Sequence, residues 1–143
     1  MSEAILRKIF LAEDDEDDCE MFEEAIQIID PTIQLTIFTD GEKIMEALRA
    51  GDAGPGMIFL DLNMPRKSGA ECVTEIRSIP DLAEVPVIIL TTSSNDNDIN
   101  KLREDGANRF VVKPNRHSRL IEFIKMILEI DWTKDTREQF LLK

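Results

Sequence analysis

Residues 57–65 read Met-Ile-Phe-Leu-Asp-Leu-Asn-Met-Pro, and this stretch decides the fold of the chain. A Gly-Pro-Gly turn at residues 54–56 precedes an unbroken run of four apolar residues. Such a short run between turn residues is typical of a strand buried on both faces of a parallel sheet. The run ends on Asp61, and Pro65 prevents further ladder pairing. Because open α/β sheets place their chemistry beyond the carboxyl ends of the strands, Asp61 is a candidate reactive group. The alternative at this point is an Asp that only begins a turn.

The composition narrows the class of protein. The chain has 143 residues, which is the length of one globular domain. It carries 17 basic residues against 29 acidic ones, and the net charge of −12 argues against nucleic acid or an anionic membrane as a partner. A single histidine leaves no material for a zinc site of imidazoles or a His-based triad. Two cysteines fit a reducing compartment, and no segment reaches the roughly 18 apolar residues of a membrane span. We therefore expect a cytoplasmic protein.

Four further apolar runs have the length of strands, and they alternate with helical patterns. The predicted strands are residues 9–12, 33–37, 57–60, 85–90 and 110–112. The second of these alternates with polar residues, which favours a position at the edge of the sheet. Apolar residues with helical spacing follow the strands at 22–29, 44–48, 70–76, 99–102 and 120–128. Five strand–helix alternations predict an α/β fold with a doubly wound parallel sheet and helices on both faces.

The helix ends carry recognisable signals. Ser68 with Glu71 forms a capping-box pattern, and Asp96 or Asp98 is suited to cap the helix over residues 99–102. Gly51 and a second glycine at position 106 are expected to end two helices.

Polar residues follow four of the five predicted strands, all at the same edge of the sheet. They are Glu13 and Asp14, Asp61, Thr91 and Lys113. Converging carboxylates repel one another unless a hard cation lies among them, and Mg²⁺ is commonly held by one or two carboxylates and waters. A lysine and a hydroxyl beside a metal are groups that phosphoryl transfer requires. A carboxylate nucleophile would give an aspartyl phosphate.

At four segments the chain resembles the receiver domain of two-component response regulators. The segments are Phe-Leu-Ala-Glu-Asp-Asp at 10–15, Leu-Asp-Leu-Asn-Met-Pro at 60–65, Leu-Thr-Thr-Ser at 90–93 and Phe-Val-Val-Lys-Pro at 110–114. Their order and spacing match the family over nearly the whole chain. Within the family, the chain looks most like the single-domain regulators associated with bacteriophytochromes. The resemblance implies five strands in the order 2-1-3-4-5.

The resemblance also implies roles for individual residues. Asp61 is then the phosphoacceptor, Asp14 binds Mg²⁺ directly, Glu13 binds it through water, and Asn63 lends a backbone carbonyl. The family pattern more often has Asp at the position of Glu13, which changes the reach to the metal by one methylene.

Further roles follow for the last two strands. Thr91 hydrogen-bonds the phosphoryl group, Lys113 pairs with it, and Phe110 changes rotamer on activation. Phe110 is also compatible with a plain core position, and Thr92 is larger than the residue frequent at its place in the family. The Lys113–Pro114 bond is expected to be cis.

The implied function is signalling rather than enzymatic catalysis. The chain would take phosphate from a sensor histidine kinase, catalyse at most its own phosphorylation and dephosphorylation, and act on a downstream protein target or a phosphotransfer protein. We expect a receiver domain over residues 1–130 and a C-terminal extension over residues 131–143, with no DNA-binding domain after it. The extension carries Trp132 and Phe140, and it either folds back on its own domain or joins a homodimer.

Three other functions compete with this interpretation. A haloacid-dehalogenase-like phosphatase needs a second Asp two residues after the nucleophile, where this chain has Asn63. A flavin-binding module would have a phosphate loop after the first strand, but an acidic run occupies that place. A degenerate receiver that acts only as a scaffold would lack some of the acids or Lys113, and all are present.

Overall fold

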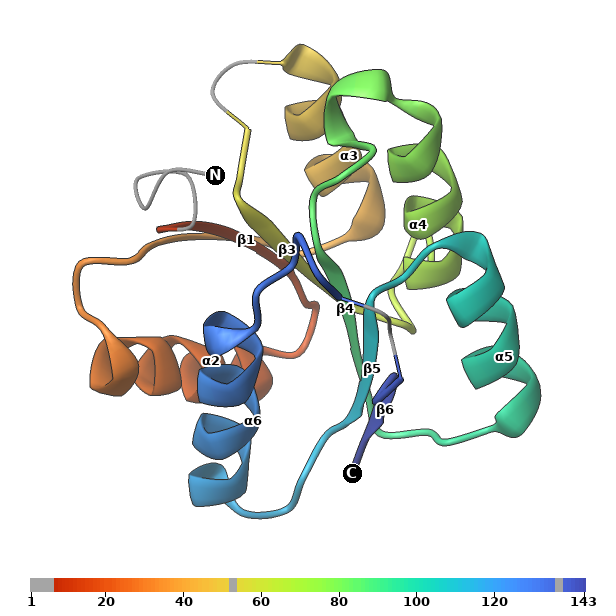
Figure 1. Cartoon of the computed structure of the whole chain (residues 1–143). Helices are drawn as coiled ribbons and strands as arrows, with labels where there is room; N and C mark the ends of the chain where they lie inside the picture. The colour runs from red at the N-terminus through yellow and green to blue at the C-terminus, as the bar shows by residue number, and fades with distance from the viewer. Residues whose placement is uncertain (1–6, 52–53, 136–137) are drawn as a thin grey trace.

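The apolar run that begins at Met57 forms the central part of a parallel sheet in the computed structural model, which describes residues 7–51, 54–135 and 138–143. The strands have the order β2-β1-β3-β4-β5-β6, and every neighbouring pair is parallel (Figure 1). Their bounds are β1 Lys8–Ala12, β2 Gln34–Phe38, β3 Met57–Asp61, β4 Val87–Thr91, β5 Arg109–Val112 and β6 Leu141–Leu142. The first five strands have the order 2-1-3-4-5 that the resemblance implied.

Helices cover both faces of the sheet, which confirms that part of the prediction (Figure 1). The helices are α2 Glu16–Ile29, α3 Gly41–Ala50, α4 Gly69–Ser78, α5 Asp96–Asp105 and α6 His117–Glu129, with a short 3₁₀ turn η1 at Pro80–Leu82. Helices α3, α4 and α5 share one apolar cluster with the sheet, and α2 and α6 share the other. Because an apolar cluster lies on each face of the sheet, successive residues of the central strands are apolar up to the polar residue that ends each strand.

Burial along the strands follows from their place in the sheet. Every residue of β3 and β4 is buried, because these strands lie in the middle and have helices on both faces. In β2 exposed and half-buried residues alternate from Gln34 to Ile37, as predicted for an edge strand. Full burial of one large apolar side chain contributes about 1.5–3 kcal/mol, so the central strands fix the frame to which the polar ends are attached.

Most helix ends are formed as the sequence indicates. Ser68 and Glu71 make the predicted capping box at the start of α4. Gly51 has φ 76°, and the glycine after α5 has φ 112°, so both adopt the left-handed conformation that ends a helix. The cap of α5 differs from the prediction, because Asn95 accepts from two backbone N–H groups while Asp96 and Asp98 lie in the first turn.

The sixth strand corrects the prediction of five. Leu141 and Leu142 pair in parallel with Phe110 and Val111 of β5, and the Phe110 N–H donates to the Phe140 carbonyl at 2.8 Å. A two-residue strand is too short to show any alternation in the sequence, and the open edge of β5 supplies the pairing that forms it.

A buried ion pair attaches the preceding segment of the extension to the domain. Arg109 donates to both carboxylate oxygens of Asp135, at 2.9 and 2.7 Å, and the two side chains are 7% and 9% exposed. The Arg109 guanidinium also lies 5.1 Å from the centre of the Trp132 ring. A bidentate arginine–carboxylate contact is among the stronger side-chain hydrogen bonds, so the extension packs on β5 at two places. The boundary at residue 130 stays a prediction.

No helix within the described ranges is long and apolar enough to cross a membrane.

Candidate functional site

The carboxyl ends of four strands bring the predicted polar residues to one edge of the sheet. Glu13 follows β1 and is 1% exposed, Asp61 ends β3 and is 7% exposed, and Thr91 ends β4 and is fully buried. Lys113 follows β5, and its backbone N–H donates to the Thr91 carbonyl at 2.7 Å. The strands are all parallel, so their ends meet at this edge as expected.

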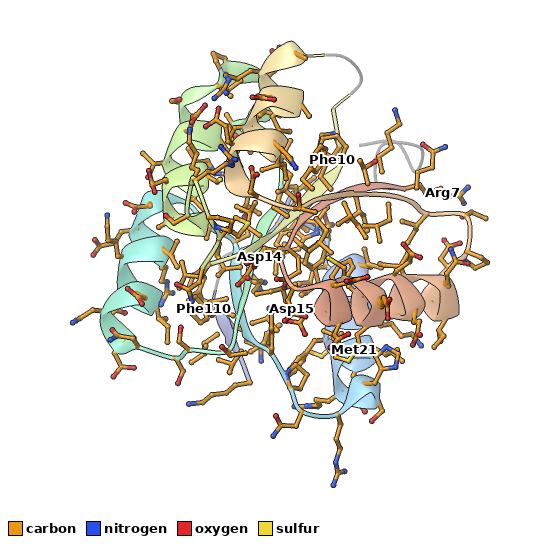
Figure 2. The ribbon with its side chains drawn as sticks, turned by 180° about the vertical axis from the view of Figure 1, so that it is seen from behind. Arg7, Phe10, Asp14, Asp15, Met21 and Phe110 are labelled. Carbon is orange, nitrogen blue, oxygen red and sulfur yellow. The ribbon has the colours of Figure 1, made fainter. Side chains whose placement is uncertain are left out.

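Three carboxylates converge there. Glu13, Asp14 and Asp61 each offer an oxygen, and these oxygens lie within 4.8 Å of one another. Asp14 is exposed and stands at the turn between β1 and α2 (Figure 2), whereas the other two acids are buried. Three oxygens of like charge at this spacing form a donor set that fits a hard divalent cation, with solvent able to complete the coordination on the open side.

The environment of Asp61 disfavours its charged form. Burial and the neighbouring Glu13 together raise its pKa to about 7. Lys113 and the backbone N–H of Asn63, which donates to Asp61 at 3.4 Å, act the other way without restoring the ordinary value. Without a cation, a large fraction of this carboxyl is therefore protonated near neutral pH.

A glycine at the start of α4 allows the chain to pass closely behind Asp61. A Cβ atom on Gly69 would lie 2.5 Å from the Asp61 carbonyl oxygen and 2.9 Å from the Leu62 Cα. The Gly69 N–H also donates to the Leu62 carbonyl at 2.9 Å. This close approach holds the loop after β3 against the strand end, and a side chain here would displace it.

Lys113 contacts two acids more closely than it contacts Asp61. Its Nζ lies 2.6 Å from Glu13, 2.8 Å from Asp18 and 3.9 Å from Asp61. Burial lowers the pKa of Lys113, but hydrogen bonds to Asp18 and Glu13 outweigh it and raise the pKa above its usual value. No role was predicted for Asp18, which lies in the acidic run after the first strand. Its place in the first turn of α2, beside the strand ends, is the signal that would have found it.

The Lys113–Pro114 bond corrects another expectation. No peptide bond in the described part of the chain is cis, so this bond is trans. The trans form is the intrinsically preferred one, by about 0.5–1 kcal/mol for a bond before proline.

Thr91 and Phe110 each have a contact that was not predicted from the sequence. The Thr91 hydroxyl lies 3.1 Å from the Ser93 hydroxyl and accepts the Ser93 N–H at 3.2 Å. Phe110 is fully buried, and its ring centre lies 6.4 Å from that of Phe140 in the extension. The Thr91 hydroxyl is therefore engaged locally by Ser93, and Phe140, the residue before β6, is an aromatic neighbour of Phe110.

Comparison with known proteins places this geometry in a family. Residues 9–125 match the model of the response regulator receiver domain. A curated relative, response regulator Rcp1 of the cyanobacterium Synechocystis sp., is 32% identical over 83% of this chain and 84% of its own length.

Solved structures agree in fold. The phosphorylated cyanobacterial phytochrome response regulator RcpA is 35% identical, with a TM-score of 0.80 over 89% of this chain and 94% of its own. The Mn²⁺-bound form of Rcp1 is 32% identical, with a TM-score of 0.76 over 90% of this chain and 96% of its own. The family match runs from β1 into α6 and includes the acidic strand ends, so the chain belongs to the response regulator receiver domain family.

Proposed function

We propose that Asp61 accepts a phosphoryl group from the phosphohistidine of a sensor histidine kinase. A carboxylate oxygen of Asp61 forms the new O–P bond, the N–P bond of the donor breaks, and the neutral imidazole leaves after taking up a proton. The observation that carries the proposal is the position of Asp61. It is buried at the end of the central strand, within the cluster of three acids and 3.9 Å from the Lys113 ammonium.

We assign Mg²⁺ to the acidic cluster. Asp14 is the direct ligand, Glu13 acts through a water molecule, and the Asn63 carbonyl completes the protein ligands together with Asp61. The three converging carboxylates support this assignment, because Mg²⁺ prefers hard oxygen donors. The Mn²⁺ reported for Rcp1 supports a divalent cation in the family. A bound Mg²⁺ would neutralise charge on the phosphoryl oxygens as the transfer proceeds.

The remaining polar residues would act on the phosphoryl group itself. In the proposal, the Lys113 ammonium pairs with one phosphoryl oxygen and the Thr91 hydroxyl leaves Ser93 to donate to another. Both side chains end at the edge where Asp61 ends, which supports these roles. The two free cysteines, Cys19 and Cys72, are compatible with a reducing compartment, and we propose a cytoplasmic location.

Output would pass through the face formed by α5, β6 and α6. If Thr91 moves toward the phosphoryl group, the ring of Phe110 gains room to turn, and Phe140 is its aromatic neighbour. Phe140 also lies under Arg103 of α5, with the guanidinium 5.7 Å from the ring centre. Rotation of Phe110 would therefore bias the packing of β6, in an equilibrium that already exists before phosphorylation.

The partner at this face is proposed to be a second copy of the chain. A groove with a volume of about 590 Å³ runs along β6 between α5 and α6. Strand β6 pairs with β5 on one side and is the last strand of the sheet among the described residues, so its outer edge is a template for another strand. Met126, which lines the groove, is 46% exposed. A downstream protein target or a phosphotransfer protein would then read the phosphorylated dimer.

The first prediction concerns the phosphoacceptor. Asp61→Asn is expected to abolish labelling by a phosphorylated kinase or by acetyl phosphate, because an amide oxygen is not a comparable nucleophile. The measurement is radiolabel incorporation, with circular dichroism to check the fold. Asp96→Asn, which removes one charge from the exposed start of α5, should retain full labelling. Undiminished label on Asp61→Asn would refute the assignment.

The second prediction concerns the cation. Asp14→Ala removes a proposed direct ligand, and we expect Mg²⁺ affinity measured by titration calorimetry to fall at least about tenfold. Asp17→Ala removes another exposed acid from the adjacent turn, outside the cluster, and should bind Mg²⁺ like the wild type. Equal affinities for the Asp14 and Asp17 variants would contradict the proposed ligand set.

The third prediction concerns the dimer. Light scattering at tens of micromolar should detect dimers, with a larger fraction when Mg²⁺ and beryllofluoride are present, because the fluorine atoms stand in for phosphoryl oxygens on Asp61. Met126→Glu places a charge in the groove and should give monomers. Ile28→Glu makes the same change at a residue of α2 that is 64% exposed, and it should leave the dimer intact. Monomers of the wild type in both states would exclude the dimer.

A further inference from the structure

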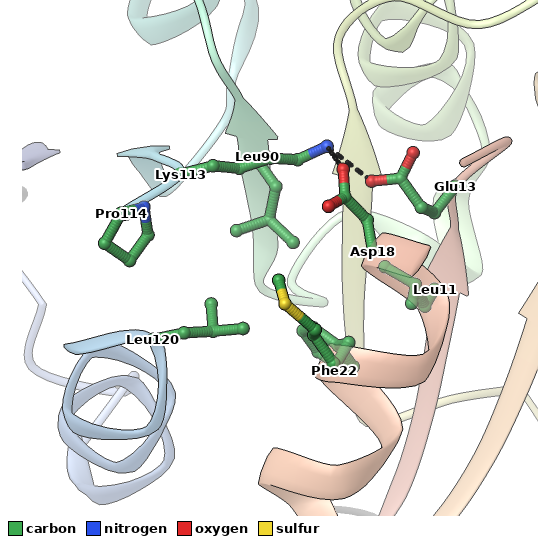
Figure 3. Close-up of a pocket in the computed structure, with 9 residues that line it drawn as sticks. Leu11, Glu13, Asp18, Phe22, Leu90, Lys113, Pro114 and Leu120 are labelled. Carbon is green, nitrogen blue, oxygen red and sulfur yellow. Dashed lines mark hydrogen bonds and ion pairs between the residues drawn. The ribbon is translucent and has the colours of Figure 1, made fainter. Parts of the chain in front are cut away.

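The Lys113 ammonium donates hydrogen bonds to two acids. Its Nζ donates to Glu13 Oε1 at 2.6 Å and to Asp18 Oδ2 at 2.8 Å, as the dashed lines in Figure 3 show. An ammonium has three donor positions, so one remains. Asp61 Oδ1 lies 3.9 Å away, which is too far for a hydrogen bond. Lys113 thus stands near Asp61 without bonding to it.

We propose that Asp18 is a positioning residue for phosphoryl transfer. It holds the Lys113 ammonium back from Asp61, so that the gap between them admits a phosphoryl oxygen. The inference rests on the proposed function of Asp61. A phosphoryl group on Asp61 extends its oxygens beyond the carboxylate oxygen, into the 3.9 Å gap. The third donor position of the ammonium then finds an acceptor while its bonds to Glu13 and Asp18 are kept.

The backbone fixes Asp18 for this purpose. It is the third residue of α2, and its N–H donates at 3.0 Å to the side chain of Asp15, the residue that caps the helix. Glu13 is less suited to hold the ammonium alone, because its other carboxylate oxygen accepts the Asp15 N–H at 3.1 Å and the side chain belongs to the three-acid cluster. Asp18 lies outside that cluster, so its carboxylate can hold the Lys113 ammonium without also being a ligand of the cation.

The surroundings of Lys113 decide where its ammonium would go without Asp18. A cavity of about 40 Å³ lies beside it, and six of the nine residues that line it are apolar: Leu11, Met21, Phe22, Leu90, Pro114 and Leu120 (Figure 3). Withdrawal into this apolar space would remove the charge from its partners. Of the acids within ion-pair distance, Asp61 is the one left after Glu13 and Asp18. Loss of the Asp18 carboxylate should therefore let Lys113 close onto Asp61 and fill the gap.

The test is the binding of beryllofluoride in the presence of Mg²⁺, measured by fluorine NMR on the full chain. Asp18→Asn keeps the size of the side chain and removes its charge. Asp17→Asn removes the same charge from the neighbouring exposed residue of α2 and is the matched control. We expect Asp18→Asn to bind beryllofluoride about fivefold more weakly than Asp17→Asn. In the Asp18→Asn variant the ion pair between Lys113 and Asp61 must first be opened before beryllofluoride can bind.

A double-mutant cycle separates positioning through Lys113 from a general effect on the fold. In a Lys113→Met background, Asp18→Asn should leave beryllofluoride affinity unchanged, because no ammonium remains to be positioned. A structural role of Asp18 would instead weaken binding equally in both backgrounds, and that result would overturn the inference.

The remaining outcomes separate the inference from the function on which it rests. If the wild type binds beryllofluoride and Asp18→Asn binds it as tightly as Asp17→Asn, the positioning role is wrong and the proposed function stands. If the wild type does not bind beryllofluoride in the presence of Mg²⁺, the proposed function fails and the positioning role fails with it.

Discussion

Repulsion among the carboxylates of Glu13, Asp14 and Asp61 is the constraint on which the rest of the site depends. The parallel sheet forces it, because strand ends in the middle of the sheet meet at one edge and carry their polar residues with them. Lys113 offsets part of the repulsion, but it is bonded to Glu13 and Asp18 rather than to Asp61. Asp61 is left buried and next to like charge, with the Lys113 ammonium 3.9 Å away and beyond hydrogen-bond distance, which is why its pKa rises to about 7.

The hydrophobic frame makes this arrangement stable. The two central strands are buried along their whole length, and helices from both faces hold them in register, so the strand ends cannot separate to relieve the repulsion. The close approach of Gly69 to the Asp61 carbonyl fixes the loop on the other side. A site of this kind favours ligands that remove or share negative charge, and a hard cation does so directly. In the metal-free protein, the buried carboxylate of Asp61 that phosphoryl transfer requires therefore lowers the stability of the fold.

Much of the fold could be predicted because its signals are local and repeated. Short apolar runs with polar ends gave the five strands, and the alternation in residues 33–37 placed one of them at the edge. The rest depended on contacts between distant segments. The strand at Leu141–Leu142 exists because β5 offers an edge, and the bond between Asp18 and Lys113 joins residues 95 positions apart. Neither leaves a periodic pattern in the sequence, and the choice of Asn95 as a cap is decided by loop geometry.

The most direct test of this account is the unfolding free energy of the wild type and Asp61→Asn in EDTA, as a function of pH. A carboxyl whose pKa is raised on folding stabilises the protein only while it is protonated, so stability is lost as pH rises from about 4 to about 7. The amide does not ionise. With allowance for solvent screening, Asp61→Asn should gain on the order of 1–2 kcal/mol over the wild type between about pH 4 and pH 8. Saturating Mg²⁺ should reduce that gain at the higher pH, because it stabilises the wild type more. A difference between the two proteins that is independent of pH would contradict the account.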